Sequence, residues 1–518
     1  LALIADDPDA PLGTFTHWTG SLSLGGVTQS VGSYGHSTST ATYPNDTYFD
    51  AAAGIVNNGF TEGMWLGITP EWNNATNWVG GIPGSSSDIT IIPSVSYQPL
   101  ISGMVVPAVC RNMTINLGAS PTVSPGQALT IDGDLSNYGS LNIQSSGVDS
   151  NGSLILNGNS TGSGLVTYYR VMPVGTAWHY VSSPVELSSI PSGSFYAWDE
   201  VAGNWSAGPV SALSNGIGYT LQTTGNSVAF SGHLLTADLN IEATSPYSEP
   251  FDGLSYTERD LVTGREYGGG GWNLLGNPYT SAINVTAFIN SNYNPDPSLS
   301  SFDPNYVALY LYNGSTYQYV TSDESGWELN WPNGTYLDAD YIQTGQGFFV
   351  LAMNDGVTFN FSHDMQAHNT NTALLKSGSS AVNRWPGMVL NVKSGNTTEN
   401  TSIIFHDGMT PGLDPIYDVG YIGSASAIQL YTMLVESNGV TFARQALTEN
   451  NALKNIIQVG LDFTKGGKVV FSAETEPLRS YKYWLEDRVT GIFTDLSKDI
   501  YTVDLPPSTY GTGRFFIH

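Results

Sequence analysis

Four aspartates have the spacing that best suits metal binding. Asp132 and Asp134 flank Gly133, and Asp296 and Asp303 lie in a loop rich in Asn, Pro and Ser. Carboxylate oxygens are ligands that Ca²⁺ prefers, so each place is a candidate calcium site. Neither place has the ligand spacing of an EF-hand. Calcium is therefore a cofactor to be tested, and no other cofactor is indicated.

Neighbouring acid and histidine side chains are the candidates for acid–base catalysis. His406 precedes Asp407 after a strand-like segment, and Glu486 precedes Asp487 in another. Successive residues on a strand point to opposite faces, so neither pair is placed to act on one substrate. Glycosidases need two carboxylates that face each other across a cleft, and adjacency in sequence does not provide this. The chain also lacks the common nucleophile-elbow, zinc-protease and nucleotide-loop motifs, so we assign no catalytic residue.

Four tyrosines form a candidate binding surface. In ALYLYNGSTYQYV, the Asn-Gly step after Tyr312 predicts a tight turn between two strands. Tyr310 and Tyr312 then share one face of their strand, and Tyr317 and Tyr319 share one face of the next. Two interpretations are open. Cross-strand aromatic packing is the commoner one, and a stacked face that binds sugar rings is the other.

The elements that position these residues belong to a repeat. The phrase GWNLLGNPY has a diverged upstream copy, AWHYVSSPV; in each a Trp precedes a Pro by six residues, and later in each copy a Gly precedes a Phe by twelve. Such patterns predict buried strands, a proline that ends a strand, and a glycine at a bulge or close backbone approach. We expect packing roles, with a ligand groove as the alternative. The motif residues are Trp178, Pro184, Trp272, Asn277, Pro278, Gly347 and Phe348.

Composition and charge limit the class of protein. Only 12% of the 518 residues are charged, and no apolar run is long enough to span a membrane. Lys and Arg number four against 30 acids before Lys376, and 12 against 14 from there on. This shift predicts a domain boundary near residues 365–385. So acidic a surface argues against nucleic-acid binding, which needs clustered cations.

We predict an all-β, multidomain chain. A short β-solenoid-like segment is followed by duplicated β-sandwich modules and a C-terminal immunoglobulin-like sandwich. An ordinary antiparallel sandwich is the alternative for the solenoid-like segment. The expected regions are an extended or strand segment at 1–62 that is available to pair with another subunit, the Trp-rich start and solenoid-like or sandwich domain at 63–165, module copies at 166–268 and 269–375, and the C-terminal sandwich at 376–518.

The solenoid interpretation makes a specific prediction about burial. Short alternating strands closed by Gly, Asn or Asp follow three spaced tryptophans. Cys110, the only cysteine, is expected to be a buried thiol. Stacked rungs would bury Ile115, Leu117, Leu129, Ile131, Leu135, Leu141 and Ile143.

Several phrases resemble the secreted and surface-exposed proteins that Bacteroidota export by the type IX pathway. They are EWNNATNWVGGIPGSSSDITIIP, WHYVSSPV, GWNLLGNPY with its later TGQGFFV, and the final GRFFIH, which together span about residues 63–518. The resemblance implies an extracellular or cell-surface location. Such proteins normally carry a C-terminal sorting domain, so its absence is what a mature form would show. The resemblance implies little about activity.

These observations predict a non-enzymatic, extracellular structural or adhesive surface protein. We expect it to be the self-assembling subunit of a filament or sheath, with copies of itself as partners. The alternative is a glycan-binding surface protein, suggested by the tyrosines and by tryptophans expected to be exposed. An extracellular glycoside hydrolase is less favoured.

Overall fold

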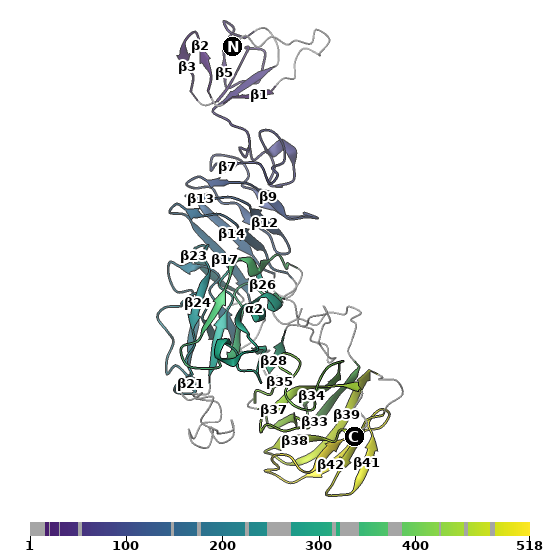
Figure 1. The fold of residues 1–518 in the computed structure, drawn as a ribbon. Coiled ribbons are helices and arrows are strands. Elements are labelled where there is room, and N and C mark those ends of the chain that lie inside the picture. Colours follow the sequence, from purple (N-terminus) through teal and green to yellow (C-terminus); the bar gives the residue numbers. More distant parts are fainter. Residues whose placement is uncertain are drawn as a thin grey trace. The chain divides into compact units, whose positions relative to one another are not determined.

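The chain is almost entirely β (Figure 1). Contacts divide it into two compact units, Leu1–Gln144 with Leu154–Thr167, and Ser145–Ser153 with Tyr168–His518. None of the described helices is long and apolar enough to cross a membrane. The computed structural model describes residues 16–19, 21–30, 32–49, 54–146, 150–172, 178–222, 227–245, 271–312, 317–321, 341–370, 386–423, 426–449, 454–476 and 482–518.

The first unit begins with a small sheet in the strand order β1-β6-β4-β5. Strands β1 and β6 are parallel, and β2 and β3 form a separate hairpin. Tyr34 and Val56 are buried in this region. The strands are β1 (Thr16–Thr19), β2 (Ser23–Leu24), β3 (Val27–Thr28), β4 (Gly32–Gly35), β5 (Tyr43–Pro44) and β6 (Ile55–Asn58).

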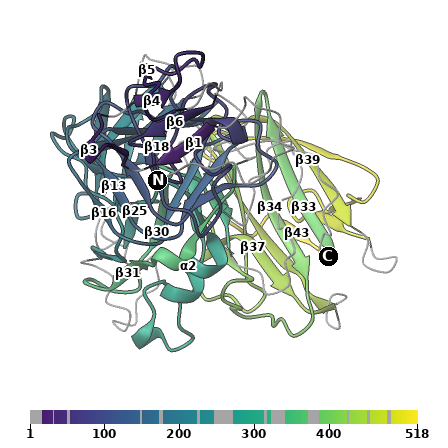
Figure 2. The same ribbon diagram turned by 90° about the horizontal axis from the view of Figure 1, so that it is seen from above.

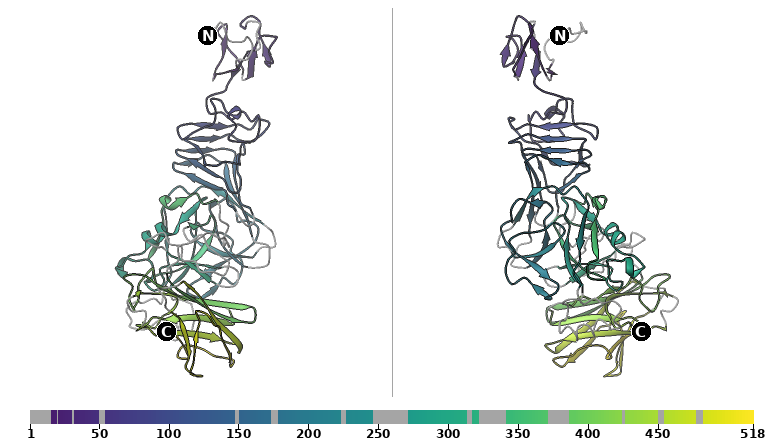
Figure 3. Two further views of the ribbon diagram at one scale, coloured as in Figure 1. Left: turned by 90° about the vertical axis from the view of Figure 1, so that its right-hand side faces the viewer. Right: turned by 60° about the vertical axis from the view of Figure 1, so that its left-hand side comes forward.

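A parallel β-solenoid follows, so the antiparallel-sandwich alternative for this segment is wrong. Three stacks of parallel strands repeat along the chain, and the stacked rungs are visible in Figure 3. The first stack is β7 (Ile89–Ile91), β10 (Met113–Ile115), β13 (Leu135–Asn137) and β16 (Ser160–Thr161). The second contains β8 (Leu100–Ile101), β11 (Thr122–Val123) and β14 (Ser140–Gln144), and the third β9 (Ala108–Cys110), β12 (Ala128–Ile131) and β15 (Ser153–Leu156).

The predicted solenoid core is confirmed except at one position. Cys110 is buried, as are the other predicted core residues apart from Leu117. Leu117 is 79% exposed, and its predicted burial is wrong. Strand β10 ends at Ile115, so Leu117 lies on the turn to the next strand, where side chains point outward.

The three tryptophans that precede the solenoid are core residues. Trp65, Trp72 and Trp78 are at most 3% exposed. The ring of Trp78 stands edge-on to the other two, at centroid distances of 4.9 and 4.8 Å. Parallel bridges from Met64 and Glu71 join this segment to the first rung. The tryptophans, with helix η1 (Ala75–Asn77), therefore cover the open end of the stack.

The two module copies in the second unit have matching sheets. Copy 1 has the strand order β18-β22-β20-β21 and copy 2 the order β25-β30-β27-β28. Each sheet starts with the Trp-containing motif, pairs it with the Gly-aromatic strand, and continues with the aromatic strand and its partner. The strands are β18 (His179–Ser182), β20 (Ser194–Asp199), β21 (Asn204–Trp205), β22 (Gly218–Gln222), β25 (Trp272–Gly276), β27 (Leu309–Tyr312), β28 (Tyr317–Val320) and β30 (Gly347–Leu351).

Copy 1 also contributes a strand that pairs with a strand of copy 2. Strand β24 of copy 1 pairs with β31 of copy 2, from Leu239 opposite Phe361 to Glu242 opposite Thr358. The remaining elements of this part are β17 (Leu165–Val171), β19 (Glu186–Leu187), β23 (Ser227–His233), β24 (Leu239–Glu242), β26 (Ala282–Asn284), α2 (Val285–Asn292), η2 (Pro297–Leu299), β29 (Tyr341–Ile342), β31 (Thr358–Phe361), η3 (His363–Met365) and β32 (Gln366–Ala367).

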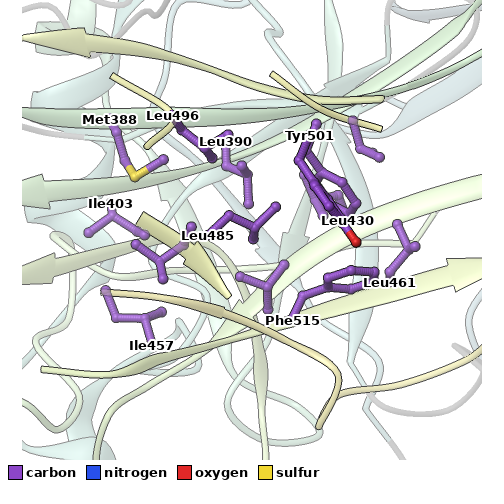
Figure 4. Close-up of a cluster of buried hydrophobic side chains, with 14 of the residues drawn as sticks. Met388, Leu390, Ile403, Leu430, Ile457, Leu461, Leu485, Leu496, Tyr501 and Phe515 are labelled. Atoms are coloured by element: carbon purple, nitrogen blue, oxygen red, sulfur yellow. The ribbon is translucent and has the colours of Figure 1, made fainter. Parts of the chain in front are cut away.

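The C-terminal part is one eleven-stranded sheet that curls into a near-barrel. Its long strands β33 and β34 lie side by side, and β34 pairs in parallel with β37 (Figure 2). Met388, Leu430, Leu485 and Phe515 belong to the buried core that the sheet encloses (Figure 4). The strands are β33 (Gly387–Ser394), β34 (Thr397–Phe405), β35 (Val419–Gly420), β36 (Ile428–Met433), β37 (Thr441–Leu447), β38 (Ile457–Phe463), β39 (Gly467–Glu476), β40 (Trp484–Asp487), β41 (Ile492–Asp495), β42 (Tyr501–Leu505) and β43 (Phe515–Ile517).

Candidate functional site

The four candidate tyrosines lie on one face of the β27–β28 pair. Tyr310 is opposite Tyr319 and Tyr312 is opposite Tyr317. The Asn-Gly step predicted to form the turn lies outside the described residues. The hairpin therefore presents two tyrosine pairs, and the pairs have different surroundings.

Tyr310 and Tyr319 hold the C-terminal near-barrel against copy 2. Tyr310 is 1% exposed, and its hydroxyl donates to the Gly420 carbonyl at 2.8 Å. The Tyr319 and Ser402 hydroxyls lie 3.2 Å apart, and the Arg444 guanidinium is 5.5 Å from the Tyr319 ring centre. Burial raises the pKa of Tyr310 well above its usual value. These two tyrosines form a domain junction and leave no open face for a sugar there.

Tyr312 and Tyr317 contact the other module copy. Their common partner is Tyr180 of β18, whose hydroxyl lies 2.8 Å from that of Tyr317. The ring of Tyr312 stacks on Tyr180 at 5.3 Å with an interplanar angle of 27°. Burial raises the pKa of Tyr317 to about 12. Both side chains remain partly exposed, so this end of the hairpin is the more accessible one.

A strained loop completes the junction with the near-barrel. Ile416 has a φ of 76°, a left-handed conformation that is unfavourable for a β-branched residue. Arg444 holds it there by donating to the carbonyls of Ile416 and Tyr417, each at 2.7 Å. The carboxylate of Asp418 accepts from the backbone N–H groups of Asp414 and Ala446. Burial raises the pKa of Asp418 to about 7.

Asp296 and Asp303 each close a local turn. One oxygen of Asp303 accepts from the backbone and side-chain nitrogens of Asn305, and Asn438 of the near-barrel donates to Asn305 at 2.7 Å. Burial raises the pKa of Asp303 to about 6. Asp296 caps η2 by accepting from the N–H and hydroxyl of Ser298.

Asp132 and Asp134 lie on the solenoid. Asn157 donates to Asp132 at 3.4 Å, and the backbone N–H of Asn159 donates to Asp134 at 2.8 Å. Within the described ranges, no three His, Cys, Asp or Glu side chains gather in a group that could hold a metal. Calcium binding at the four aspartates therefore stays a prediction.

Asp134 belongs to a ladder that sequence reasoning missed. Asn112 donates to Asp88 at 2.7 Å and accepts from the backbone N–H of Asp134 at 2.8 Å, and Asp134 accepts in turn from Asn159. The partners are 24, 22 and 25 residues apart, which is one rung each. The sequence does contain a signal for this ladder, because an Asp or Asn directly precedes each strand of the first stack. Arg111 pairs with Asp88 at the first rung.

The motif glycines are positions of close approach between the two copies. A Cβ on Gly218 would lie 2.5 Å from the Leu275 carbonyl oxygen, and one on Gly347 would lie 3.2 Å from the Tyr180 backbone. Each copy thus places its glycine against the Trp-motif strand of the other. Phe348, beside Gly347, is fully buried.

The other motif residues divide into core and surface. Asn277 is fully buried. Its side chain donates to the carbonyls of Ser281, Ile342 and Gln343 and accepts from the backbone N–H of Tyr279. Trp272 and Pro184 are buried as expected. Trp178 is 38% exposed, which corrects the expectation that it repeats the core role of Trp272. It lies one residue before β18, whereas Trp272 is the first residue of β25.

One buried cation was also missed. Arg170 is 1% exposed and donates to the Thr344 carbonyl of copy 2. Burial lowers its pKa to about 10. An arginine in an alternating strand carries no signal in sequence that separates burial from exposure, because either face of the strand can turn inward.

The fold defines a class of modular, all-β protein built from a solenoid, two interlocked module copies and a near-barrel. The chain belongs to the family described as a domain of unknown function (DUF8693), whose model matches residues 64–518. It is also similar to the minor fimbrium subunit Mfa5 of Porphyromonas gingivalis, with 24% identity over 475 residues. That alignment covers 83% of this chain and 37% of the relative, so the chain spans little more than a third of the relative's length. No solved structure matches the chain.

Proposed function

We propose that this protein is a structural subunit of a cell-surface fimbria or related filament and that it assembles with copies of itself. The observation that carries the proposal is the similarity to a fimbrial subunit across 83% of the chain. An extracellular location reached by type IX export is part of the proposal, supported by the sequence resemblance to Bacteroidota surface proteins.

The construction of the second unit suits a load-bearing role. The pairing of β24 with β31, the glycines in close contact and the tyrosine junction tie the modules to each other and to the near-barrel. Separating copy 1 from copy 2, or copy 2 from the near-barrel, would break backbone hydrogen bonds and expose aromatic surface, which is unfavourable in water. The parts are therefore expected to move as one body under tension.

Negative-stain electron microscopy of the purified chain, with calcium and with a chelator, tests assembly. Ordered polymers are expected, and surface labelling of intact cells should detect the protein. A chain that stays monomeric at high concentration in both conditions would contradict self-assembly. Polymers seen only with calcium would support the calcium prediction as well.

The tyrosine hairpin, as a whole, is not favoured as a glycan site. Tyr310 and Tyr319 are committed to the junction with Gly420 and Ser402. A sugar-binding role would need a different surface.

A further inference from the structure

The sheet of copy 1 carries a row of aromatic side chains on one face. Tyr180 and Tyr196 are both opposite Thr220, on the two sides of β22. Trp198 follows two residues after Tyr196 and is opposite Trp205 on β21. Since alternate residues share a face, these rings lie on the same side of the sheet. Trp178, two residues before Tyr180, extends the row.

Copy 2 covers only part of this aromatic face. Phe349 packs edge-on against Tyr180 and Trp198, each at a centroid distance of 5.4 Å. Trp178 is 38% exposed, and Tyr196 and Trp205 are also partly exposed. The two ends of the row are therefore open to solvent, and its middle is fixed by the neighbouring module.

Packing holds the exposed rings in place. Trp178 stands at 75° to Tyr196 with their centroids 5.4 Å apart. Trp205 stands at 73° to Trp198, also at 5.4 Å, and is tilted by 45° to Tyr180 at 5.6 Å. Rings that are already ordered lose little conformational freedom when a ligand binds, which favours affinity.

Some polar groups on this aromatic face have hydrogen-bond partners within the protein, and others do not. The indole N–H of Trp198 donates to Glu200 at 2.7 Å and to the Trp272 carbonyl at 2.8 Å. The indole N–H groups of Trp178 and Trp205 have no hydrogen-bond partner in the part of the chain that the structure describes. Thr220, between Tyr180 and Tyr196, is 3% exposed, and its hydroxyl is likewise unpaired among the described residues.

We propose that this face binds a neutral oligosaccharide. Sugar rings have apolar C–H faces that suit aromatic rings and hydroxyls that can pair with free indole N–H groups. The Thr220 hydroxyl is buried beneath the rings and is one of several unpaired buried groups among the described residues, so the partly exposed indole N–H groups of Trp178 and Trp205 carry the polar part of this proposal. The net charge of −28 repels acidic glycans, which selects neutral ones. The proposal is independent of filament formation.

The test measures binding of neutral hexasaccharides of glucose, mannose, xylose and N-acetylglucosamine to the full chain, by tryptophan fluorescence and calorimetry. At least one series should bind.

Trp178→Ala removes an exposed ring outside any strand and should weaken binding roughly tenfold. Trp205→Phe keeps an aromatic ring and removes the N–H group, so it should weaken binding severalfold. Tyr138→Ala, which removes a 48% exposed tyrosine from the solenoid, is the matched control and should change nothing.

Three results would overturn the proposal. The first is a wild-type chain that binds none of these sugars or binds only sialylated or sulfated ones. The second is equal binding by wild type, Trp178→Ala and Trp205→Phe. The third is a Trp178→Ala variant that no longer forms polymers while the wild type binds no sugar. The aromatic face would then be a contact between subunits. Assembly is followed by microscopy in the same preparations, so failure of sugar binding leaves the filament proposal separately testable.

Discussion

At the scale of single residues, two buried carboxyls of the near-barrel show how hydrogen bonding decides protonation. Glu399 is 8% exposed, and its Oε1 atom has no hydrogen-bond partner among the described residues. Burial raises its pKa to about 7. Asp487 is fully buried, and burial by itself raises its pKa. Hydrogen bonds from Arg514 and Tyr501 outweigh this effect and hold the pKa at about 2.

Glu399→Gln should stabilise the near-barrel at a pH above the pKa of Glu399. Because the folded pKa of Glu399 lies above its unfolded value near 4.3, the folded state binds the proton more tightly, and stability falls as pH rises from about 4 to 7. Glutamine does not ionise, so the variant does not lose stability in this way as pH rises. Its near-barrel transition in calorimetry should be more stable than that of wild type at pH 8, by about 1–3 kcal/mol, and nearly unchanged at pH 4. Equal shifts at both pH values would contradict the assignment.

Asp487→Asn should show the opposite pH dependence. The folded pKa of Asp487 is depressed, so its stabilisation is present above the unfolded value near 3.9 and is lost as pH falls toward 2. Breaking a buried pair with Arg514 costs about 3–5 kcal/mol. The calorimetric destabilisation should therefore be large at pH 7 and much smaller at pH 2.5. A pH-independent effect would show that packing, and not charge, holds Asp487.

At the scale of elements, the module copies were recognisable in sequence but their mutual contacts were not. The Trp, Pro and Gly landmarks predicted matching strands, because they depend on local spacing. Which strand each glycine contacts depends on how two distant segments pack. Gly218 lies against β25, and Gly347 against β18.

Gly218→Ala tests this interlock. The added Cβ would lie 2.5 Å from a backbone oxygen of β25, and backbone must shift to admit it. Overpacking of this kind costs about 1–3 kcal/mol. The thermal midpoint of the module transition should fall. Gly208→Ala, also in copy 1 but with no atom within 4 Å of the new Cβ, is the control and should leave the midpoint unchanged.

The solenoid ladder makes a prediction that separates structure from calcium binding. Asp134 accepts from Asn159 through one oxygen, which an asparagine can also provide. Asp134→Asn should therefore keep wild-type stability, whereas Asp134→Ala should lose about 0.5–1.5 kcal/mol. Thermal unfolding with and without calcium measures both. If calcium stabilises wild type and Asp134→Asn abolishes that gain, the aspartate is a metal ligand after all.

At the scale of the whole molecule, the uneven charge bears on the proposed assembly. Of 44 acids, 30 precede Lys376, where only four Lys or Arg residues occur. Copies of so acidic a chain repel each other at long range, and salt screens that repulsion. The same change in the balance of acids and bases is the basis of the predicted boundary near residues 365–385.

Assembly should accordingly be promoted by salt. Raising the ionic strength from about 10 mM to 150 mM shortens the screening length from roughly 30 Å to 8 Å, so polymer growth measured by light scattering should begin at a lower protein concentration. Growth that salt suppresses would indicate that ion pairs between the acidic region and the more basic C-terminal part drive assembly.

The sequence by itself determined the all-β class, the solenoid rungs and the duplication, because these are written in residue periodicity and short-range spacing. It did not determine which aromatic residues are buried. Trp272 and Trp178 occupy matching positions of the repeat, yet one is 7% exposed and the other 38%. Tyr310 and Tyr312 share a face, but their partners, Gly420 and Tyr180, lie in different domains. Only the tertiary structure decided these outcomes, since burial depends on segments more than a hundred residues apart.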